Sequence, residues 1–482
     1  MKTSSGQLFK AALDDHPGKS GIQLLDSGRD ALQMRLALLE MAERAIDLQY
    51  YIWNSDYSGR LLAERVLKAA DRGVRVRLLL DDFNVGDRDA PLVAMDGHPN
   101  VEVRIYNPNA SRKGLAKWLA LIGEFGRLNQ RMHNKSFVVD GTAAIVGGRN
   151  IGDEYFDLGE NLNFRDRDLI AVGPVVSQIS QGFDDYWNSQ RSFPVSAIAS
   201  VKADQVDMAG IRHKLQRILQ MYPEPDYVLP VDRKTGLSKL EHLCSELIWA
   251  DAAVVFDRVR EPEDVEGEQP KQVAQTLGEM VQNSRKEILI ESAYLILGDG
   301  GTNLFKKMTG RGVSVRALTN SLASNDLTTN HAGYARRRPQ MLASGIELYE
   351  LRPDAASCQQ LIGSSERCGE ESIFGLHSKS MVFDRATVFV GSFNLNLRSV
   401  YLNSEIGLVV KSRELAERIA ADIKENMRKE NSWRIMQDEN GMLFWTGWKN
   451  GKQVRYLSEP EAGFWRRLKS GLFSLLPVEK YL

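Results

Sequence analysis

Two eight-residue stretches decide the fold of this chain: HNKSFVVD at residues 133–140 and HSKSMVFD at residues 377–384. Both fit the pattern His-x-Lys-x-x-x-x-Asp. Each is followed, at the same offset, by a glycine-containing turn that ends in asparagine, GGRN at 147–150 and GSFN at 391–394. Two such motifs with matching turns arise by chance in roughly fewer than one sequence in a thousand. The chain therefore carries one unit twice.

The apolar runs around the motifs also come in pairs. They are rich in β-branched and aromatic residues, which is typical of strands, and segments of helical periodicity separate them. The paired runs are 46–53 with 288–296, 72–80 with 311–318, and 101–108 with 346–353. Strands that alternate with helices indicate an α/β fold. We therefore expect two similar halves, each a mixed β-sheet flanked by helices, packed about a pseudo-two-fold axis.

Length and local composition suggest where these halves begin and end. The chain has 482 residues, about three times the common domain size. Stretches rich in proline and acidic residues lie near 222–234 and 261–271, as expected of linkers or surface loops. We therefore expect an N-terminal half over residues 1–210, a linker region over 211–275 and a C-terminal half over 276–482.

The overall composition excludes several classes of protein. A formal net charge of −1 argues against a coat for nucleic acid, and so no nucleic-acid partner is expected. Cys244, Cys358 and Cys368 are too few and too scattered for a disulfide framework, so reduced thiols are expected. The sequence contains no long apolar run of a transmembrane helix and no secretory signal over residues 1–21.

The motif residues form a set that suits a phosphodiester. Side chains two positions apart on a strand share one face, so each histidine projects together with its lysine, and the glycine turn adds the asparagine. Two halves then supply two imidazoles, two ammonium groups and two amides. Ammonium and amide groups bind the phosphate oxygens, while one imidazole attacks phosphorus and the other protonates the leaving oxygen. No metal-ligand spacing is present, and no metal or cofactor is expected.

The paired motifs resemble those of the phospholipase D superfamily, and the resemblance covers nearly the whole chain. Further stretches resemble the bacterial cardiolipin synthases that lack transmembrane helices. They are 47–53, 131–135, 146–153, 331–335 and 476–479. The resemblance implies an active site between the two halves, with His133 as the nucleophile that forms a phosphohistidine and His377 as the general acid.

The resemblance also implies roles for the other motif residues. Those expected to bind or surround the phosphate are Lys135, Lys379, Asn150, Asn394, Ser392 and Gly148. The motif aspartates, Asp140 and Asp384, are expected to be structural. A downstream carboxylate is expected to orient each histidine through its second ring nitrogen. Glu405 fits His377, and Asp166 fits His133, with Asp168 as the alternative.

A basic segment begins at His331 and contains arginines at 336–338. It has two interpretations, a solvated basic helix or a binding site for a lipid head group. In the second interpretation His331 and Arg336 contact the substrate.

Three functions remain open. The first is a phosphatidyl transferase that makes cardiolipin from a phosphatidyl donor and phosphatidylglycerol. The second is a hydrolytic phosphodiesterase, a phospholipase D or a nuclease, in which water takes the second step. The third is a non-catalytic lipid-binding module. Two intact motifs favour an enzyme, and aromatic residues with scattered basic ones favour lipid over nucleic acid.

Two segments predict contact with an anionic membrane surface. Over 463–476, apolar residues recur on one helical face, beside Arg466, Arg467 and Lys469. The apolar residues are Phe464, Trp465, Leu468, Leu472, Leu475 and Leu476. A similar stripe over 112–127 contains Trp118. The alternative is that either stripe packs on the protein core. We expect a peripheral protein of the bacterial inner membrane.

Overall fold

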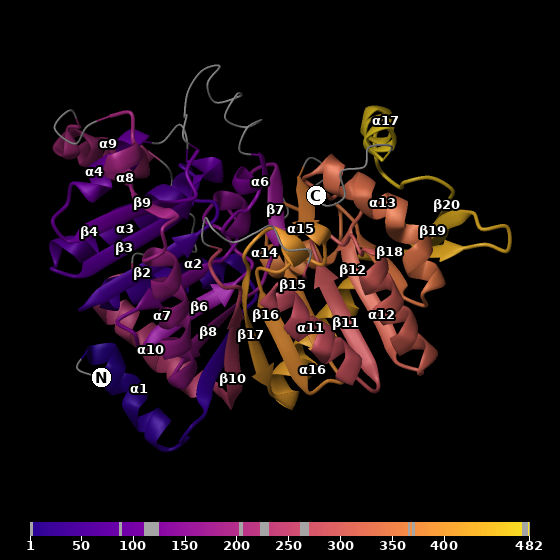
Figure 1. The fold of residues 1–482 in the computed structure, drawn as a ribbon, viewed down its shortest axis with the longest axis horizontal. Coiled ribbons are helices and arrows are strands. Elements are labelled where there is room, and N and C mark those ends of the chain that lie inside the picture. The colour runs from indigo at the N-terminus through magenta and orange to yellow at the C-terminus, as the bar shows by residue number, and fades with distance from the viewer. Residues whose placement is uncertain are drawn as a thin grey trace.

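The computed structural model describes residues 3–85, 89–109, 125–201, 206–221, 231–260, 269–364, 367–368, 372–474 and 481. Two halves lie side by side, the N-terminal half in indigo to magenta and the C-terminal half in orange to yellow (Figure 1). Each half has a β-sheet with helices packed against it. This arrangement confirms the expected α/β fold built from a repeated unit.

In the described part of the N-terminal half, the sheet contains eight strands. They are β1 (Ser20–Leu25), β2 (Ala45–Tyr50), β3 (Arg75–Asp81), β4 (Val101–Tyr106), β5 (Ser136–Val139), β6 (Ala143–Gly147), β8 (Asp168–Val172) and β9 (Ser192–Pro194). Their order across the sheet is β9-β4-β3-β2-β5-β6-β8-β1. Neighbours among β2, β3 and β4 are parallel and the other pairs are antiparallel, so the sheet is mixed.

The C-terminal half repeats this order. Its strands are β10 (Ile248–Phe256), β11 (Glu287–Ser292), β12 (Ser314–Asn320), β13 (Glu347–Leu351), β15 (Lys379–Phe383), β16 (Thr387–Gly391), β17 (Ile406–Lys411), β18 (Ser432–Gln437), β19 (Leu443–Lys449) and β20 (Lys452–Tyr456). Their order is β10-β17-β16-β15-β11-β12-β13-β18-β19-β20. From β10 to β18, each strand has a counterpart at the same place in the first sheet.

Helices cover the sheets and connect their strands. In the N-terminal half they are α1 (Ser4–Asp14), α2 (Gly28–Met41), α3 (Tyr57–Asp71), η1 (Asp82–Asn84), α4 (Asp89–Asp96), α6 (Phe125–Leu128), η2 (Asp153–Tyr155), α7 (Pro174–Trp187) and α8 (Val195–Ile198). Beyond them lie α9 (Met208–Met221), α10 (Arg233–Glu246), α11 (Gln272–Asn283), α12 (Asp299–Gly310), α13 (Thr328–Ala343), α14 (Ser357–Ile362), α15 (Leu397–Tyr401), α16 (Arg413–Asn426) and α17 (Phe464–Phe473). Within the described ranges, no helix has the length and apolar character needed to cross a bilayer.

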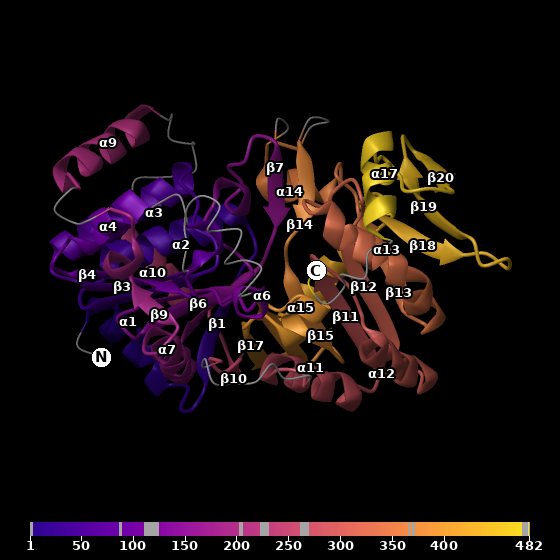
Figure 2. The same ribbon diagram turned by 45° about the horizontal axis from the view of Figure 1, so that its top comes forward.

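The two sheets join at their edges. Strand β10 pairs antiparallel with β1 of the first half and with β17 of the second, so the segment expected to be a linker contributes a central strand. A second connection is the parallel pair of β7 (Leu162–Arg165) and β14 (Ile373–Leu376), which lies between the halves (Figure 2). Where each half ends as a folding unit stays a prediction.

A shared core fixes the halves against each other. Buried residues of β5, β6 and β8 pack with buried residues of β15, β16 and β17 in one cluster. Apolar surface buried between two sheets stabilises their relative placement in proportion to its area. The loops at the ends of these strands are therefore held in a defined geometry.

The expectation that all three cysteines are reduced is wrong. Cys358, at the start of α14, forms a disulfide with Cys368, with their Cα atoms 5.8 Å apart. Cys244 is free and half-buried. Disulfide formation depends on how close a loop brings two Cα atoms, which the number and spacing of cysteines do not reveal. The bond closes a short loop that precedes β14.

Candidate active site

Both motif histidines lie just before a strand rather than on it. Strand β5 begins three residues after His133, and β15 begins two residues after His377. The backbone N–H of His133 donates to the carbonyl of Ser404 (2.9 Å), and that of His377 donates to the carbonyl of Arg165 (2.8 Å). Each histidine is therefore held by a backbone segment of the other half.

The orienting carboxylates also come from the other half. Nδ1 of His133 lies 2.8 Å from Oε2 of Glu405, and Nδ1 of His377 lies 2.5 Å from Oδ2 of Asp166. The expected pairing, Glu405 with His377 and Asp166 with His133, is therefore wrong. The reason is topological, because β7 runs beside β14 and a bridge joins Met132 to Ser404, so each carboxylate crosses the interface.

Asp168, the alternative partner for His133, lies in an ion cluster with two arginines. Its Oδ2 accepts from the guanidinium of Arg35 (2.9 Å) and lies 3.5 Å from that of Arg149. All three side chains are buried. This ion cluster stabilises the first half beneath its glycine turn.

The carboxylate contacts determine which ring nitrogen of each histidine reacts. With Nδ1 held by a carboxylate, the proton of a neutral imidazole resides on Nδ1 and Nε2 carries the lone pair. Both rings are almost fully buried. Burial lowers the pKa of His133 to about 4, although Glu405 opposes the shift. Burial and the two motif lysines lower the pKa of His377 well below its usual value. Both rings are therefore neutral near pH 7 before substrate binds.

The motif lysines fold back on their histidines. Nζ of Lys135 donates to the carbonyl of His133 (2.6 Å), and Nζ of Lys379 donates to that of His377. Burial lowers the pKa of Lys135 to about 7 and that of Lys379 to about 8. A bound phosphate would favour the charged form of both lysines, since an anion nearby stabilises an ammonium group.

The two asparagines have different surroundings. Asn150 accepts from the backbone N–H of Ile52 (3.2 Å) and donates to the hydroxyl of Tyr155 (3.1 Å). Asn394 is buried, and its side-chain oxygen has no hydrogen-bond partner among the described residues. A buried amide oxygen without a partner is costly and is available to a ligand hydroxyl.

Ser392 and Gly148, expected to surround the phosphate, contact the carboxylates. Oγ of Ser392 donates to Oε2 of Glu405 (2.5 Å). At the equivalent place in the first half, a Cβ on Gly148 would lie 2.1 Å from Oδ1 of Asp166, far inside van der Waals contact. The glycine is therefore needed because Asp166 approaches the backbone closely there.

The motif aspartates each bind a backbone turn. Asp140 accepts from the successive N–H groups of residues 43–45 (3.1, 2.8 and 3.0 Å). Asp384 accepts in the same way from residues 285–287 (2.9, 2.7 and 3.0 Å). These turns lead into β2 and β11. Both carboxylates therefore fix the start of a central strand.

His331 and Arg336, the candidates for head-group contact, differ in their exposure to solvent. His331 is fully buried, with Nε2 3.3 Å from Oε1 of Glu459, whereas Arg336 is exposed. Arg338 is also buried, between Glu459 (2.8 Å) and Glu350 (3.4 Å). A fully solvated basic helix is therefore wrong, because one face of α13 packs as a buried ion cluster.

Aromatic rings around the histidines were not singled out by the sequence analysis. Tyr51 meets the His133 ring edge-on at 5.0 Å between centroids, and Tyr155 meets His377 in the same way at 5.0 Å. Phe83 stacks on Tyr51 and is 62% exposed. The run at 46–53 contains Tyr51, but nothing in its spacing marked the ring as an active-site wall.

An arginine cluster across the interface was also missed. Arg167 contacts the carboxylates of Glu291, Asp422 and Asp26, and Arg165 contacts Asp422 as well. Both arginines flank Asp166, so the cluster anchors the segment that orients His377. Sequence spacing gives no sign of partners more than a hundred residues away.

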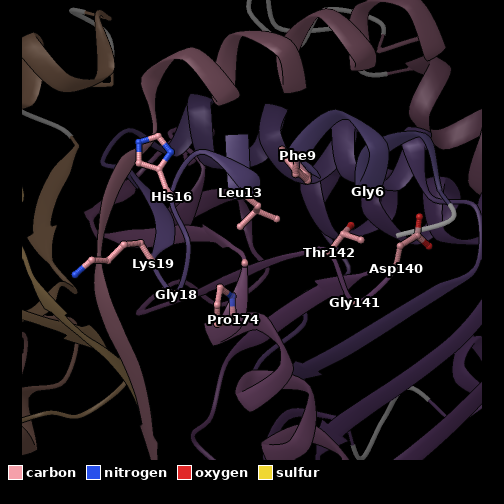
Figure 3. Close-up of a pocket in the computed structure, with 11 residues that line it drawn as sticks. Gly6, Phe9, Leu13, His16, Gly18, Lys19, Asp140, Gly141, Thr142 and Pro174 are labelled. Carbon is pink, nitrogen blue, oxygen red and sulfur yellow. The ribbon is translucent and has the colours of Figure 1, made fainter. Parts of the chain in front are cut away.

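Two further observations bear on ligands. Among the described residues, no group of three or more His, Cys, Asp or Glu is arranged to hold a metal ion. A cavity of about 350 Å³ lies between α1 and the turn at Asp140, Gly141 and Thr142 (Figure 3). Neither motif histidine lines that cavity.

Comparison with known proteins places the chain in a family. A family model described as "Cardiolipin synthase, PLD-like domain" matches residues 36–187 and 277–427. The chain is 38% identical over 470 residues to cardiolipin synthase C of Escherichia coli, with 96% of each chain covered. It is 25% identical to a cardiolipin synthase of Geobacillus kaustophilus, covering 86% of this chain and 68% of that one.

A solved structure shows the same fold. The phosphatidylserine synthase of Haemophilus influenzae superposes with a TM-score of 0.59, covering 89% of this chain and 92% of that one at 13% identity. The two matched ranges of the family model each contain one histidine motif and together span well over half of the sequence. This chain therefore belongs to the cardiolipin synthase family of phospholipase D-like enzymes.

Proposed function

We propose that this enzyme transfers a phosphatidyl group to phosphatidylglycerol and so makes cardiolipin. The observation that carries the proposal is the crossed pair of buried histidines, each with Nδ1 on a carboxylate of the other half. One site thus holds two imidazoles for attack and protonation. The names of the relatives support a phospholipid substrate.

In the first step, Nε2 of His133 attacks the phosphorus of a phospholipid donor. A P–N bond forms and the bond from phosphorus to the head-group oxygen breaks. His377 gives a proton to the leaving oxygen, and the head group departs as an alcohol. Glu405 stabilises the positive charge on the His133 ring, because the carboxylate lies on its other nitrogen.

In the second step, His377 removes the proton that it needs for the next cycle. A glycerol hydroxyl of phosphatidylglycerol gives its proton to Nε2 of His377, and its oxygen attacks phosphorus. The P–N bond to His133 breaks and cardiolipin leaves. The same general acid thus becomes the general base, as microscopic reversibility requires.

The phosphate is bound by the groups around the histidines. Lys135 and Lys379 neutralise its charge, and the amides of Asn150 and Asn394 contact its oxygens or the attacking hydroxyl. Negative charge on the bound phosphate also raises the pKa of His377 from its low resting value, which favours the protonated form that the first step needs.

Hydrolysis is the competing function, because water in place of the lipid alcohol gives phosphatidic acid. The test is incubation with vesicles of phosphatidylglycerol, alone and mixed with phosphatidylethanolamine, followed by lipid mass spectrometry. Cardiolipin as the main product is expected. Phosphatidic acid as the main product would overturn the transferase in favour of a phospholipase, and no lipid product would overturn both.

The enzyme reaches its lipid, in this proposal, through α17. The apolar stripe of α17 is exposed: Phe464 by 71%, Trp465 by 77% and Leu472 by 61%. The guanidinium of Arg466 contacts the carbonyl of Asn325, next to α13, and α17 stands out beyond the sheet in Figure 1. The stripe therefore does not pack on the core. Residues 475–482 and the second stripe near Trp118 lie mainly outside the described residues.

Membrane contact by α17 is testable with matched variants. Changing Phe464 and Trp465 to serine should weaken co-sedimentation with phosphatidylglycerol vesicles, because these rings supply apolar surface beside a basic rim. Met442→Ser, which removes an apolar side chain exposed by 58% in the loop between β18 and β19, is the control and should bind normally. Unchanged binding by the double variant would refute docking through α17.

A further inference from the structure

Asp257 lies directly after β10 and connects two segments that are distant in the sequence. Its Oδ2 accepts from the backbone N–H of Glu405 (2.9 Å), and its Oδ1 accepts from that of Val273 at the start of α11 (2.9 Å). Its own N–H donates to the carbonyl of Glu405 (3.0 Å). The side chain is buried. Asp257 therefore binds both backbone groups of the residue that orients His133.

Lys271 holds the residues just before Glu405. Its Nζ donates to the carbonyls of Leu402 and Asn403, both at 2.8 Å. Its backbone N–H donates to the carbonyl of Val400 (3.0 Å). Burial raises the pKa of Asp257 and lowers that of Lys271, and the two opposite charges partly offset both shifts. The turn before β17 is thus fixed at several successive backbone groups.

This turn carries the contacts that hold His133. Ser404 accepts from the backbone N–H of His133 (2.9 Å), and the Glu405 carboxylate meets its ring (2.8 Å). A shift of the turn would move both contacts together. Such a shift matters because a displacement of about 1 Å in a reacting group can cost a hundred-fold in rate.

We propose that Asp257 is a positioning residue for His133, acting through the backbone of Glu405. Asp257 does not touch the substrate phosphate in this proposal. It keeps the Glu405 carboxylate at the distance that fixes the imidazole tautomer and ring orientation. The inference rests on the proposed role of His133, but it holds for phosphatidyl transfer and for hydrolysis alike.

The first half shows what the same position looks like without this function. Ser27 lies after β1 as Asp257 lies after β10, and its hydroxyl accepts from the backbone N–H of Asp30 (3.0 Å) at the start of α2. It caps a helix, as Asp257 does. The orienting carboxylate Asp166 is instead held by the backbone N–H of Arg167 (2.7 Å). Ser27→Ala is therefore a matched control that removes a cap without reaching a histidine.

The decisive variant is Asp257→Asn, which keeps the size of the side chain. An amide has one acceptor oxygen, so its NH2 group must face the N–H of either Glu405 or Val273. We expect kcat for phosphatidylglycerol turnover to fall about ten- to a hundred-fold, as for other groups that orient a functional histidine, with KM nearly unchanged. Ser27→Ala should lower the melting temperature and leave kcat unchanged.

A spectroscopic measurement separates positioning from folding. Protons shared between a histidine Nδ1 and a carboxylate give low-field proton NMR signals, and the two crossed pairs should give one signal each. Asp257→Asn should shift or broaden only the signal that Glu405→Gln removes. Ser27→Ala should leave both signals in place.

The outcomes distinguish this inference from the proposed function. Normal kcat and an unshifted His133 signal in Asp257→Asn, beside an inactive His133→Ala, would overturn the positioning role alone. Full activity of His133→Ala would overturn the proposed mechanism itself. A fall in kcat with both signals unchanged would also count against positioning, because it would show that Asp257 acts on something other than the His133–Glu405 pair.

Discussion

The two histidine sites contain the same motif and are supported in different ways. Glu405, which orients His133, accepts from the hydroxyls of Ser392 (2.5 Å) and Ser399 (2.7 Å). Asp166, which orients His377, lies between Arg165 and Arg167, whose side chains form ion pairs with other carboxylates. Glu405 is thus held by hydroxyl groups that donate to its side chain. Asp166 is held through the backbone between two arginines whose side chains form ion pairs.

This difference shifts the pKa values of the two carboxylates in opposite directions. Burial raises the pKa of both acids. At Glu405, His133, Lys135 and the Ser392 hydroxyl outweigh burial, so its pKa is lowered. At Asp166, Lys379 and Arg149 offset burial only in part, and its pKa is raised. A firmly ionised Glu405 makes His133 the more basic ring in the absence of substrate, which favours His133 as the nucleophile.

Replacing either histidine should have the largest effect and tests whether the two histidines have different roles. His133→Ala and His377→Ala should each lower turnover by roughly three orders of magnitude or more, because nucleophile and general acid act as a unit. The measurement is turnover of phosphatidylglycerol vesicles together with acid-quench trapping of labelled phosphoenzyme. Label on His377 in the wild-type enzyme would reverse the two roles, and label on neither ring would contradict a covalent intermediate.

The carboxylates should give the next largest effects. Glu405→Gln and Asp166→Asn should each cost about a hundred- to ten-thousand-fold in kcat, since an amide supports the wrong imidazole tautomer. The crossed pairing predicts that Glu405→Gln affects His133 and that Asp166→Asn affects His377. Single-turnover kinetics should show slower phosphoenzyme formation in Glu405→Gln. If each variant instead impaired the histidine of its own half, as judged by the NMR signals, the crossed assignment would fail.

Substitutions to alanine at the equivalent positions 148 and 392 should lower kcat to different extents. A methyl group on Gly148 would overlap Asp166, so Gly148→Ala should lower kcat about a hundred-fold by displacing that carboxylate. Ser392→Ala removes one of two hydroxyl donors to Glu405 and leaves the Ser399 hydroxyl in place. Because Glu405 keeps a donor and its position, the effect on kcat should be smaller than that of Gly148→Ala. Equal effects in steady-state assays would mean that the two carboxylates are held alike.

The last prediction concerns the pH dependence of stability and not turnover. The pKa of His133 is about 4 in the folded protein against 6.5 for an ordinary histidine, so the unfolded chain binds more protons in this range. Stability should therefore fall as the pH decreases from about 6.5 to 4, by up to roughly 3 kcal/mol from this group. Urea unfolding at several pH values should show a weaker loss in His133→Asn, which keeps a donor for Glu405. Parallel curves would contradict a buried neutral ring.

Much of the fold was readable from the repeated sequence. The paired runs became matching strands, and Leu61, Leu62, Val66, Leu67 and Ala70 all lie in the core on α3. These features are local, because strand and helix periodicity depends on neighbouring residues. The motif residues were also found by spacing alone, and the structure brings His133, Lys135, His377 and Lys379 into one buried cluster.

What depended on contacts between distant residues was not readable. Glu405 and Asp166 were found as the orienting acids but assigned to the wrong histidines, because nothing in the sequence tells whether a segment crosses the interface. The same holds for Arg167, whose partners lie more than a hundred residues away. The disulfide was missed for another reason, because the spacing of Cys358 and Cys368 does not show how close the chain brings them. Asp257 carries no motif, and the role proposed for it rests on its contacts with the backbone of Glu405 and Val273.

The exchange of carboxylates between halves has a consequence for how such an enzyme can arise by gene duplication. A single ancestral half would contain a histidine but not the acid beside it, so it would work only as a pair of identical copies that each lend the acid to the other. Fusion of the two copies joins the halves covalently. Each half then meets the other at an effective concentration on the order of millimolar or higher. Assembly of the site no longer depends on how much protein the cell makes. Each copy is then free to change its own supports, as the arginine cluster on one side and Asp257 on the other illustrate.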